Sequence, residues 1–275
     1  MNAAGRLVEV RAEGERALKN LLDVMTFVET HKPSAELRVV LLNNVIVATV
    51  STIEETIRQL FIEYLTIIEE RIDSHEKLRS ALRQANAEKY AERIRALIKE
   101  RNEREAASAV DRLRICLSGG AGYQLEKLAI ADNRGNFRSK QVTEIAKQIG
   151  LTELWDKISD APEVEQYIGL PAGAACAGRL IQAWNEVFDE RDLVVHRVSR
   201  ANGWGAEKIR QTVALFLLVL DRITACITND LLSLLPEESD LASPVQPRIE
   251  SDYESDVSQR TYPLRVGQIG NRRGD

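Results

Sequence analysis

The chain has 275 residues, 44% of them hydrophobic and 29% charged, with a net charge of -5 at pH 7. This composition is typical of a soluble globular protein, and the acidic balance excludes a protein that coats nucleic acid non-specifically, because such binding needs many lysines and arginines on one surface. Cys116, Cys176 and Cys226 are dispersed and form no C-x-x-C motif, so we expect free thiols and no metal site. The N-terminus is charged and no apolar run approaches the roughly 20 residues of a membrane span. We therefore expect a cytoplasmic protein without a membrane anchor or cofactor.

Apolar residues recur mostly at helical spacing, which predicts an all-α fold. The first two helices are expected at 4–30 and 35–72, separated by Pro33, with Ser34 as the N-cap of the second. That second helix is apolar on nearly all sides, as is typical of the centre of a bundle. From 75 to 117 the apolar positions thin out among many Glu, Lys and Arg, and the pattern predicts one long charged helix. It is either a solvated helix held by i,i+4 ion pairs or a protruding arm that contacts a partner.

The second half of the chain contains glycine-rich breaks and shorter helices. The segment 118–122 is glycine-rich but lacks the G-K-[ST] of a phosphate-binding loop, so we expect an ordinary loop. A short amphipathic helix is predicted at 139–149, with Gly150 just beyond its C-terminus. Two further helices are predicted at 177–198 and 206–235, the second with a clear apolar stripe.

An arginine and a histidine stand five residues apart near the end of the first of these two helices. Arginine holds phosphate oxygens with a fork of donors, and histidine exchanges protons near neutral pH. On a regular helix, residues five apart differ by about 140° around the axis and about 7.5 Å along it. Arg191 and His196 of one chain therefore meet on one phosphate only if the helix kinks, or if a second copy brings its own pair across a two-fold axis. The alternative is an ordinary helix surface.

The stretch Arg191-Asp192-x-x-x-His196 resembles the R-x(4–6)-H motif of HEPN domains, in which a polar residue typically follows the arginine. Three other segments are similar to the RiboL-PSP-HEPN branch of that superfamily: 39–54, 136–151 and 206–227. The resemblance implies a HEPN-like helical domain over 1–235 with its core at about 35–235, the charged helix at 75–117 being an elaboration. The tail at 236–275, rich in Ser, Pro, Asp and Glu, is expected to form no packed structure.

The resemblance also implies an activity. The HEPN proteins that carry this motif are metal-independent endoribonucleases that work as homodimers. They are found as toxins of toxin–antitoxin systems or as phage-defence effectors of prokaryotes. Carried over to this chain, Arg191 and His196 are the catalytic residues, and Asp192 orients the histidine or the RNA. A neutralising or sensor protein is then an expected partner besides RNA. Arg197 departs from the family pattern, in which a small residue is common at that position.

The charge around the motif agrees with RNA binding. Between 191 and 210 five residues are basic and two are acidic, in a chain that is acidic overall. The expected phosphate-binding residues besides Arg191 are Arg197, Arg200, Lys208 and Arg210. Trp204 is interpreted either as a base-stacking platform or as a turn residue that packs on the core. The competing function is a non-catalytic helical interaction module that binds a partner through 75–117 or through the tail.

Overall fold

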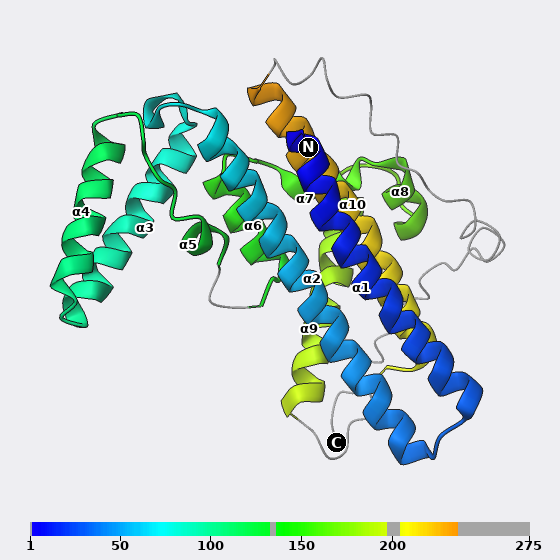
Figure 1. The fold of residues 1–275 in the computed structure, drawn as a ribbon. Helices are drawn as coiled ribbons and strands as arrows, with labels where there is room; N and C mark the ends of the chain where they lie inside the picture. Colours follow the sequence, from blue (N-terminus) through cyan, green and yellow to red (C-terminus); the bar gives the residue numbers. More distant parts are fainter. Residues whose placement is uncertain (1, 133–135, 197–203, 236–275) are drawn as a thin grey trace, which may run out of the picture.

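The computed structural model describes residues 2–132, 136–196 and 204–235, and this part of the chain contains helices and no strand, which confirms the all-α prediction. The elements in chain order are α1 (Ala3–His31), α2 (Ala35–Arg71), η1 (His75–Lys77), α3 (Ser80–Lys99), α4 (Glu103–Leu117), α5 (Lys127–Ala131), α6 (Ser139–Gln148), α7 (Leu154–Ser159), α8 (Pro162–Ile168), α9 (Ala174–His196) and α10 (Ala206–Leu234) (Figure 1). The tail at 236–275 lies outside the described residues.

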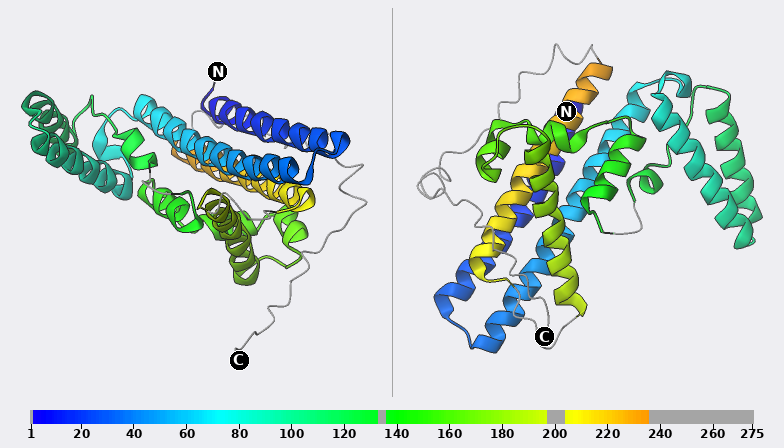
Figure 2. Two further views of the ribbon diagram at one scale, coloured as in Figure 1. Left: turned by 90° about the horizontal axis from the view of Figure 1, so that it is seen from below. Right: turned by 180° about the vertical axis from the view of Figure 1, so that it is seen from behind.

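Three long helices, α1, α2 and α10, run side by side and form the main body (Figure 2). The helix α1 lies on one side of α2 and α10, and the shorter helices α5 to α9 lie on the other (Figure 2). The predicted N-cap is confirmed, since the Ser34 side chain accepts a hydrogen bond from the Leu37 N–H at 3.3 Å. Close packing of α1 on α2 depends on Gly14, because a Cβ there would lie 2.4 Å from the Thr56 side chain.

The prediction of one long charged helix at 75–117 is wrong. This segment forms the turn η1 followed by a hairpin of α3 and α4. The chain turns at Glu100, and Arg101 takes the left-handed conformation with φ 60°. Asn102 then caps α4 by accepting a hydrogen bond from the Glu105 N–H at 3.3 Å. No glycine or proline marks this turn, so the run of good helix formers concealed it. The hairpin, called the arm below, projects from the body (Figure 1).

Two of the described helices, α2 and α10, are long and apolar enough to cross a membrane when only length and composition are judged. The sequence predicted none, because charged residues interrupt the apolar runs, such as Asp221 and Arg222 in α10. The core helix of a soluble protein meets the same criteria, and 56% of the window in α10 is buried in the fold. In α2 only 33% of the window is buried, so part of this apolar helix is left uncovered.

Aromatic side chains fix the second layer of helices to the body. The ring centroid of Trp184 in α9 lies 5.5 Å from that of Trp155, 5.6 Å from that of Phe188 and 4.9 Å from that of Phe216 in α10. Trp184 is fully buried. This cluster holds α7, α9 and α10 together and thereby sets the position of α9, the helix that carries the Arg191–His196 motif.

Candidate functional site

The motif occupies the last turns of α9, which continues as a helix from Ala174 to His196. Arg191 and Asp192 are half-buried, whereas His196 is exposed. The helix is assigned without interruption through both residues, and regular helix geometry separates Arg191 and His196 by about 140° around the axis. One copy of the chain therefore does not aim both side chains at one point. Arg197 and Arg200 lie outside the described residues.

Asp192 is the centre of a group of side chains that we call the arginine cluster: Asn136, Arg138, Asp189, Arg191 and Asp192. Arg191 donates from Nη1 to Asp192 Oδ1 at 2.9 Å and to Asn136 Oδ1 at 3.3 Å. Arg138 donates from Nη2 to Asp192 Oδ2 at 2.9 Å and from Nη1 to Asp189 Oδ1 at 2.6 Å. The Asn136 amide donates to both oxygens of Asp192 at 3.3 Å. Asp192 thus anchors two arginines, one from each side of the contact between α9 and the segment before α6.

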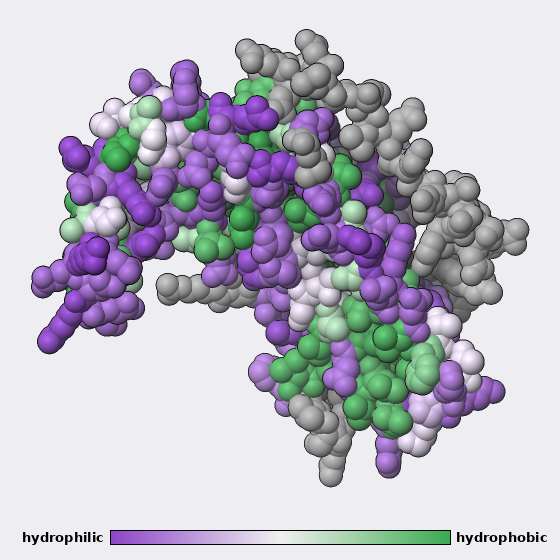
Figure 3. Space-filling model, viewed as in Figure 1, coloured by the Kyte–Doolittle hydropathy of each residue, from purple (hydrophilic) through white to green (hydrophobic). Residues whose placement is uncertain are grey.

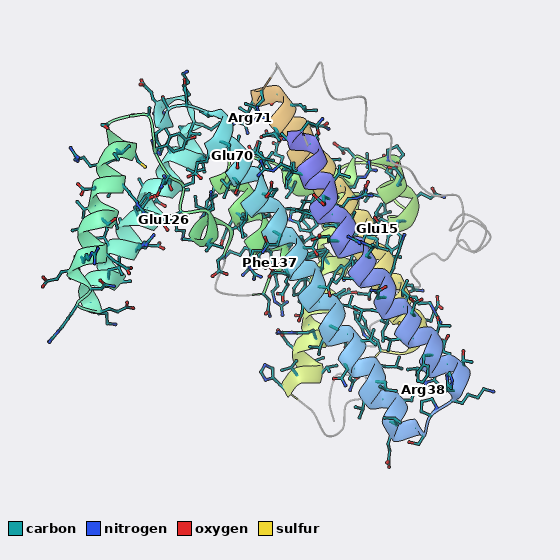
Figure 4. The ribbon with its side chains drawn as sticks, in the orientation of Figure 1. Glu15, Arg38, Glu70, Arg71, Glu126 and Phe137 are labelled. Atoms are coloured by element: carbon teal, nitrogen blue, oxygen red, sulfur yellow. The ribbon has the colours of Figure 1, made fainter. Side chains whose placement is uncertain are left out.

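The segment that supplies Asn136 and Arg138 is itself held by α2 and α9. The Phe137 N–H donates to Glu54 Oε1 at 2.9 Å, and the indole N–H of Trp184 donates to the Phe137 carbonyl oxygen at 2.9 Å. Ser139 and Asn185 exchange two hydrogen bonds, of 3.0 and 2.9 Å. Phe137 lies beside the middle of α2 (Figure 4). These contacts position Arg138 before any substrate binds.

Asn136 and Arg138 were not among the site residues expected from the sequence. The segment that contains them was part of the family resemblance, but nothing in it indicated which residues would face α9. One feature of the sequence could have indicated them: Asn136 and Arg138 are polar residues on either side of Phe137, which is fully buried. Such an alternation places both polar neighbours on one side of the segment.

The charges of the arginine cluster compensate one another. Burial raises the pKa of Asp192, but hydrogen bonds from Arg191 and Arg138 outweigh it, so the pKa is lowered overall. Burial by itself lowers the pKa of Arg138. The carboxylates of Asp189 and Asp192 outweigh burial and raise this pKa overall, so the guanidinium stays charged. Among the described residues, the hydrogen bonds of Arg191 all leave from Nη1, and its buried Nε has no partner. Within the described ranges Nη2 of Arg191 has no hydrogen-bond partner, and a guanidinium nitrogen of this kind can donate to an anion.

The predicted RNA-binding residues of α10 have protein partners. Trp204 is half-buried and packs against the hydrophobic core, which agrees with the core-packing alternative, and Lys208 Nζ lies 5.1 Å from the centroid of its ring. Arg210 forms ion pairs with Glu29 of α1 and with Glu207, the second at 3.8 Å. The backbone of Trp204 also hydrogen-bonds Glu190, whose pKa is raised by burial in spite of this bond. This contact joins the end of α9 to the start of α10.

In the described ranges, no group of three or more His, Cys, Asp or Glu side chains is arranged to hold a metal ion. Cys116, Cys176 and Cys226 are free thiols, and the pKa of each is raised, mainly by burial. Burial disfavours the reactive thiolate at all three positions. The arginine cluster and His196 are thus the groups of the described chain with the clearest potential for chemistry.

An all-α bundle that carries an arginine and a histidine near the end of its penultimate long helix defines the class of HEPN proteins. The family model RiboL-PSP-HEPN matches residues 13–229, and the chain belongs to this family. HEPN domains are generally associated with ribonuclease activity and RNA-related roles. The match begins inside α1, ahead of the position near 35 where the sequence resemblance began. No curated protein and no solved structure gives a significant match.

Proposed function

We propose that the chain is a metal-independent endoribonuclease of the HEPN type that cuts RNA at a composite site in a homodimer, as a prokaryotic toxin or phage-defence effector. The observation that supports this most is the arginine cluster. It holds Arg191 in place through Nη1, on the same helix as an exposed histidine, His196. The structure separates the two groups around the helix, so two copies are needed to surround one phosphate.

In this mechanism the two histidines of the dimer exchange protons with the RNA. One His196 takes the proton of a ribose 2′-hydroxyl, whose oxygen forms a bond to phosphorus. The bond from phosphorus to the 5′-oxygen breaks, and the second His196, protonated, gives its proton to that oxygen. The products are a 2′,3′-cyclic phosphate and a 5′-hydroxyl. Both Arg191 side chains donate to the phosphate oxygens and stabilise the charge that builds on them in the transition state.

The hydrogen bonds of Asp192 support a role different from the one that the family resemblance implies. Its carboxylate accepts hydrogen bonds from Arg191, Arg138 and Asn136. We therefore propose that Asp192 is a positioning residue for Arg191 and does not orient His196. Arg138 acts in the same way, because it balances the charge of Asp192 and fixes its second oxygen.

The test is RNA cleavage by the purified protein in excess EDTA, with wild type beside His196→Ala and Arg191→Ala. Arg114→Ala is the matched control, because Arg114 is a solvent-exposed arginine of the arm, far from α9 along the chain. We expect a 2′,3′-cyclic phosphate product from wild type and Arg114→Ala and no product from the two motif variants, each still dimeric. The nuclease proposal is refuted if wild type cuts no RNA, or if the two motif variants cut RNA as well as wild type does.

The competing proposal, a non-catalytic interaction module, is favoured by one feature of the arm. Ile98, Val110 and Leu117 are large apolar side chains exposed on α3 and α4. In that case Arg191→Ala and wild type would be equally folded and equally harmless to cells, whereas Ile98→Glu would abolish the biological effect. The nuclease proposal predicts the opposite: Arg191→Ala abolishes the biological effect and Ile98→Glu leaves it intact.

A further inference from the structure

The face of α9 that carries His196 also carries two aspartates. Asp189, Asp192 and His196 are three and four residues apart, so on a regular helix they fall within about 60° of one another around the axis. Asp192 precedes His196 by about 6 Å along the axis, and Asp189 precedes it by about 10.5 Å. Arg191 lies about 140° from His196, with Asp192 between them. The charged side chains that precede His196 on its own face are therefore carboxylates.

Both of these carboxylates are bound by Arg138, the N-cap residue of α6. Its Nη1 donates to Asp189 Oδ1 at 2.6 Å, and its Nη2 donates to Asp192 Oδ2 at 2.9 Å. Its guanidinium thus lies along the His196 face of the same chain, and it carries more N–H donors than these two bonds use. The buried neighbour Phe137 fixes the backbone from which this side chain extends. Arg138 is therefore a fixed cation on the His196 face.

The two ion pairs of Arg138 differ in how firmly they are held. The Asp192 side chain is 30% exposed, and its carboxylate also accepts hydrogen bonds from Arg191 and Asn136. The Asp189 side chain is 63% exposed and binds only Arg138 within the cluster. An exposed ion pair stabilises a protein little, because water solvates both partners almost as well. The bond to Asp189 is therefore the one that another anion can replace.

The surface on the other side of the end of α9 is mostly apolar. Figure 3 shows hydrophobic residues gathered over the end of the body where α1 is followed by α2. Four large apolar side chains are exposed there: Val24, Phe27, Leu37 and Val40. Val45 and Val194 belong to one buried cluster that joins this end of the body to α9. Apolar side chains donate no hydrogen bonds to phosphate, so we expect an RNA backbone to run from His196 along α9 toward Arg138.

We propose that Arg138 binds a phosphate of the RNA next to the one that is cut, and that Asp189 occupies this position until the RNA displaces it. The inference rests on the proposed function, because it takes RNA to be the ligand of His196. A guanidinium binds two phosphate oxygens with parallel hydrogen bonds, which an exposed carboxylate on one nitrogen does not match. Arg138 keeps its bond to Asp192 throughout, so it still positions Arg191.

The charges of the cluster change when Asp189 is displaced. With Asp189 in place, the two arginines and the two aspartates of the cluster sum to zero. Once the Asp189 carboxylate turns to water, Arg138, Arg191 and Asp192 leave one net positive charge facing the RNA. Asp189 thus lowers the affinity for RNA in two ways: it competes for Arg138, and it repels the phosphate that replaces it. The first effect exists only while Arg138 is present.

The test is a double-substitution cycle on RNA binding, with full-length His196→Ala as the parent so that the RNA stays intact. The probe is a fluorescently labelled single-stranded oligoribonucleotide of mixed sequence, followed by anisotropy. Asp189→Asn should lower the dissociation constant about three- to five-fold. Arg138→Gln should raise it about tenfold and flatten its salt dependence by about 0.7 in the logarithmic slope. In the Arg138→Gln background, most of the gain from Asp189→Asn should vanish.

Asp111→Asn is the matched control, because Asp111 is an exposed aspartate that pairs with an arginine, Arg114, on the arm. It should leave the dissociation constant unchanged at physiological salt, where distant charges are screened. Circular dichroism and urea unfolding show whether each variant is folded. Asp189→Asn changes an exposed side chain and should fold normally, so the affinity gain can be judged even if Arg138→Gln is destabilised.

Three results would overturn the inference: no measurable RNA binding by the parent, no gain from Asp189→Asn, or the same gain with and without Arg138. The last result would mean that Asp189 acts only through its charge. Failure of this inference can be told from failure of the nuclease, because binding is measured without cleavage. If wild type cuts RNA while the two substitutions are additive, only this inference is overturned. If they are coupled while wild type cuts no RNA, the inference holds and the nuclease proposal is refuted.

Discussion

Replacing Asp192 by alanine tests whether this carboxylate holds the arginine cluster together. The substitution removes the acceptor of hydrogen bonds from Arg191, Arg138 and Asn136. A hydrogen bond to a charged group contributes about 1.5–3 kcal/mol when it is shielded from water. The Asp192 and Arg138 side chains are each 30% exposed, so water recovers part of the loss. We expect the free energy of unfolding to fall by about 1–2 kcal/mol near pH 7.

The loss should depend on pH in one direction. Because the pKa of Asp192 is lowered in the folded protein, the folded state binds this proton more weakly than the unfolded state does. The stabilisation is therefore complete above the ordinary aspartate pKa of about 4 and is lost as the pH falls through the lower folded value. The difference between wild type and Asp192→Ala should be largest near pH 7 and should narrow as the pH falls below about 4.

The assay is urea unfolding followed by circular dichroism, at fixed protein concentration, across this pH range. Asp189→Ala is the matched control, because Asp189 binds only Arg138 within the cluster and its side chain is 63% exposed. It should lose no more than about 0.5 kcal/mol. If Asp192→Ala loses no more than Asp189→Ala, or if its deficit is the same near pH 3 as near pH 7, Asp192 does not hold the cluster. RNA cleavage by Asp192→Ala should also fall, because Arg191 loses the carboxylate that holds it in position.

Three further substitutions test the fold. Tyr64→Phe removes the hydroxyl that donates to Asp230 at 2.6 Å and should cost about 1 kcal/mol in urea unfolding; no loss would mean that the bond is not formed in solution. Gly14→Ala places a Cβ 2.4 Å from the Thr56 side chain and should cost about 1–3 kcal/mol, partly recovered in the double variant with Thr56→Ala. A neutral Gly14→Ala would contradict the close approach of α1 and α2. Arg101→Gly should raise the unfolding free energy by up to about 1 kcal/mol, because φ is 60° there, and a decrease would refute the turn between α3 and α4.

The sequence predicted the long helices well because their signals are local. Ser34 after Pro33 marks the start of α2, and the positive φ of Gly150, 86°, follows the end of α6 as expected. The turn at Glu100 to Asn102 was missed. All its neighbours are good helix formers, and an asparagine N-cap inside a charged run looks like one more polar residue of a solvated helix.

Of the arginine cluster, the sequence singled out Arg191 and Asp192 but not Asn136 and Arg138. Arg191 and His196 were recognised because their spacing along one helix is a property of the sequence. Arg138 and Asn136 were missed because they lie more than 50 residues away, and only the packing of Phe137 between α2 and α9 brings them to Asp192. The sequence also did not show that Asp192 would accept hydrogen bonds from Arg138 and Asn136, since both come from another part of the chain.

The sequence by itself determined the helical class, the family and the motif, because apolar periodicity and residue spacing are written along one dimension. The tertiary structure decided which side of each helix is covered. Leu37 and Val45 of α2 are both aliphatic, yet one is exposed and the other buried. Periodicity records which residues avoid water, but only neighbouring elements determine which of them are covered. At the end of α9, for example, Val194 is buried while its neighbours Leu193 and Val195 are exposed, a difference that the sequence of three aliphatic residues does not show.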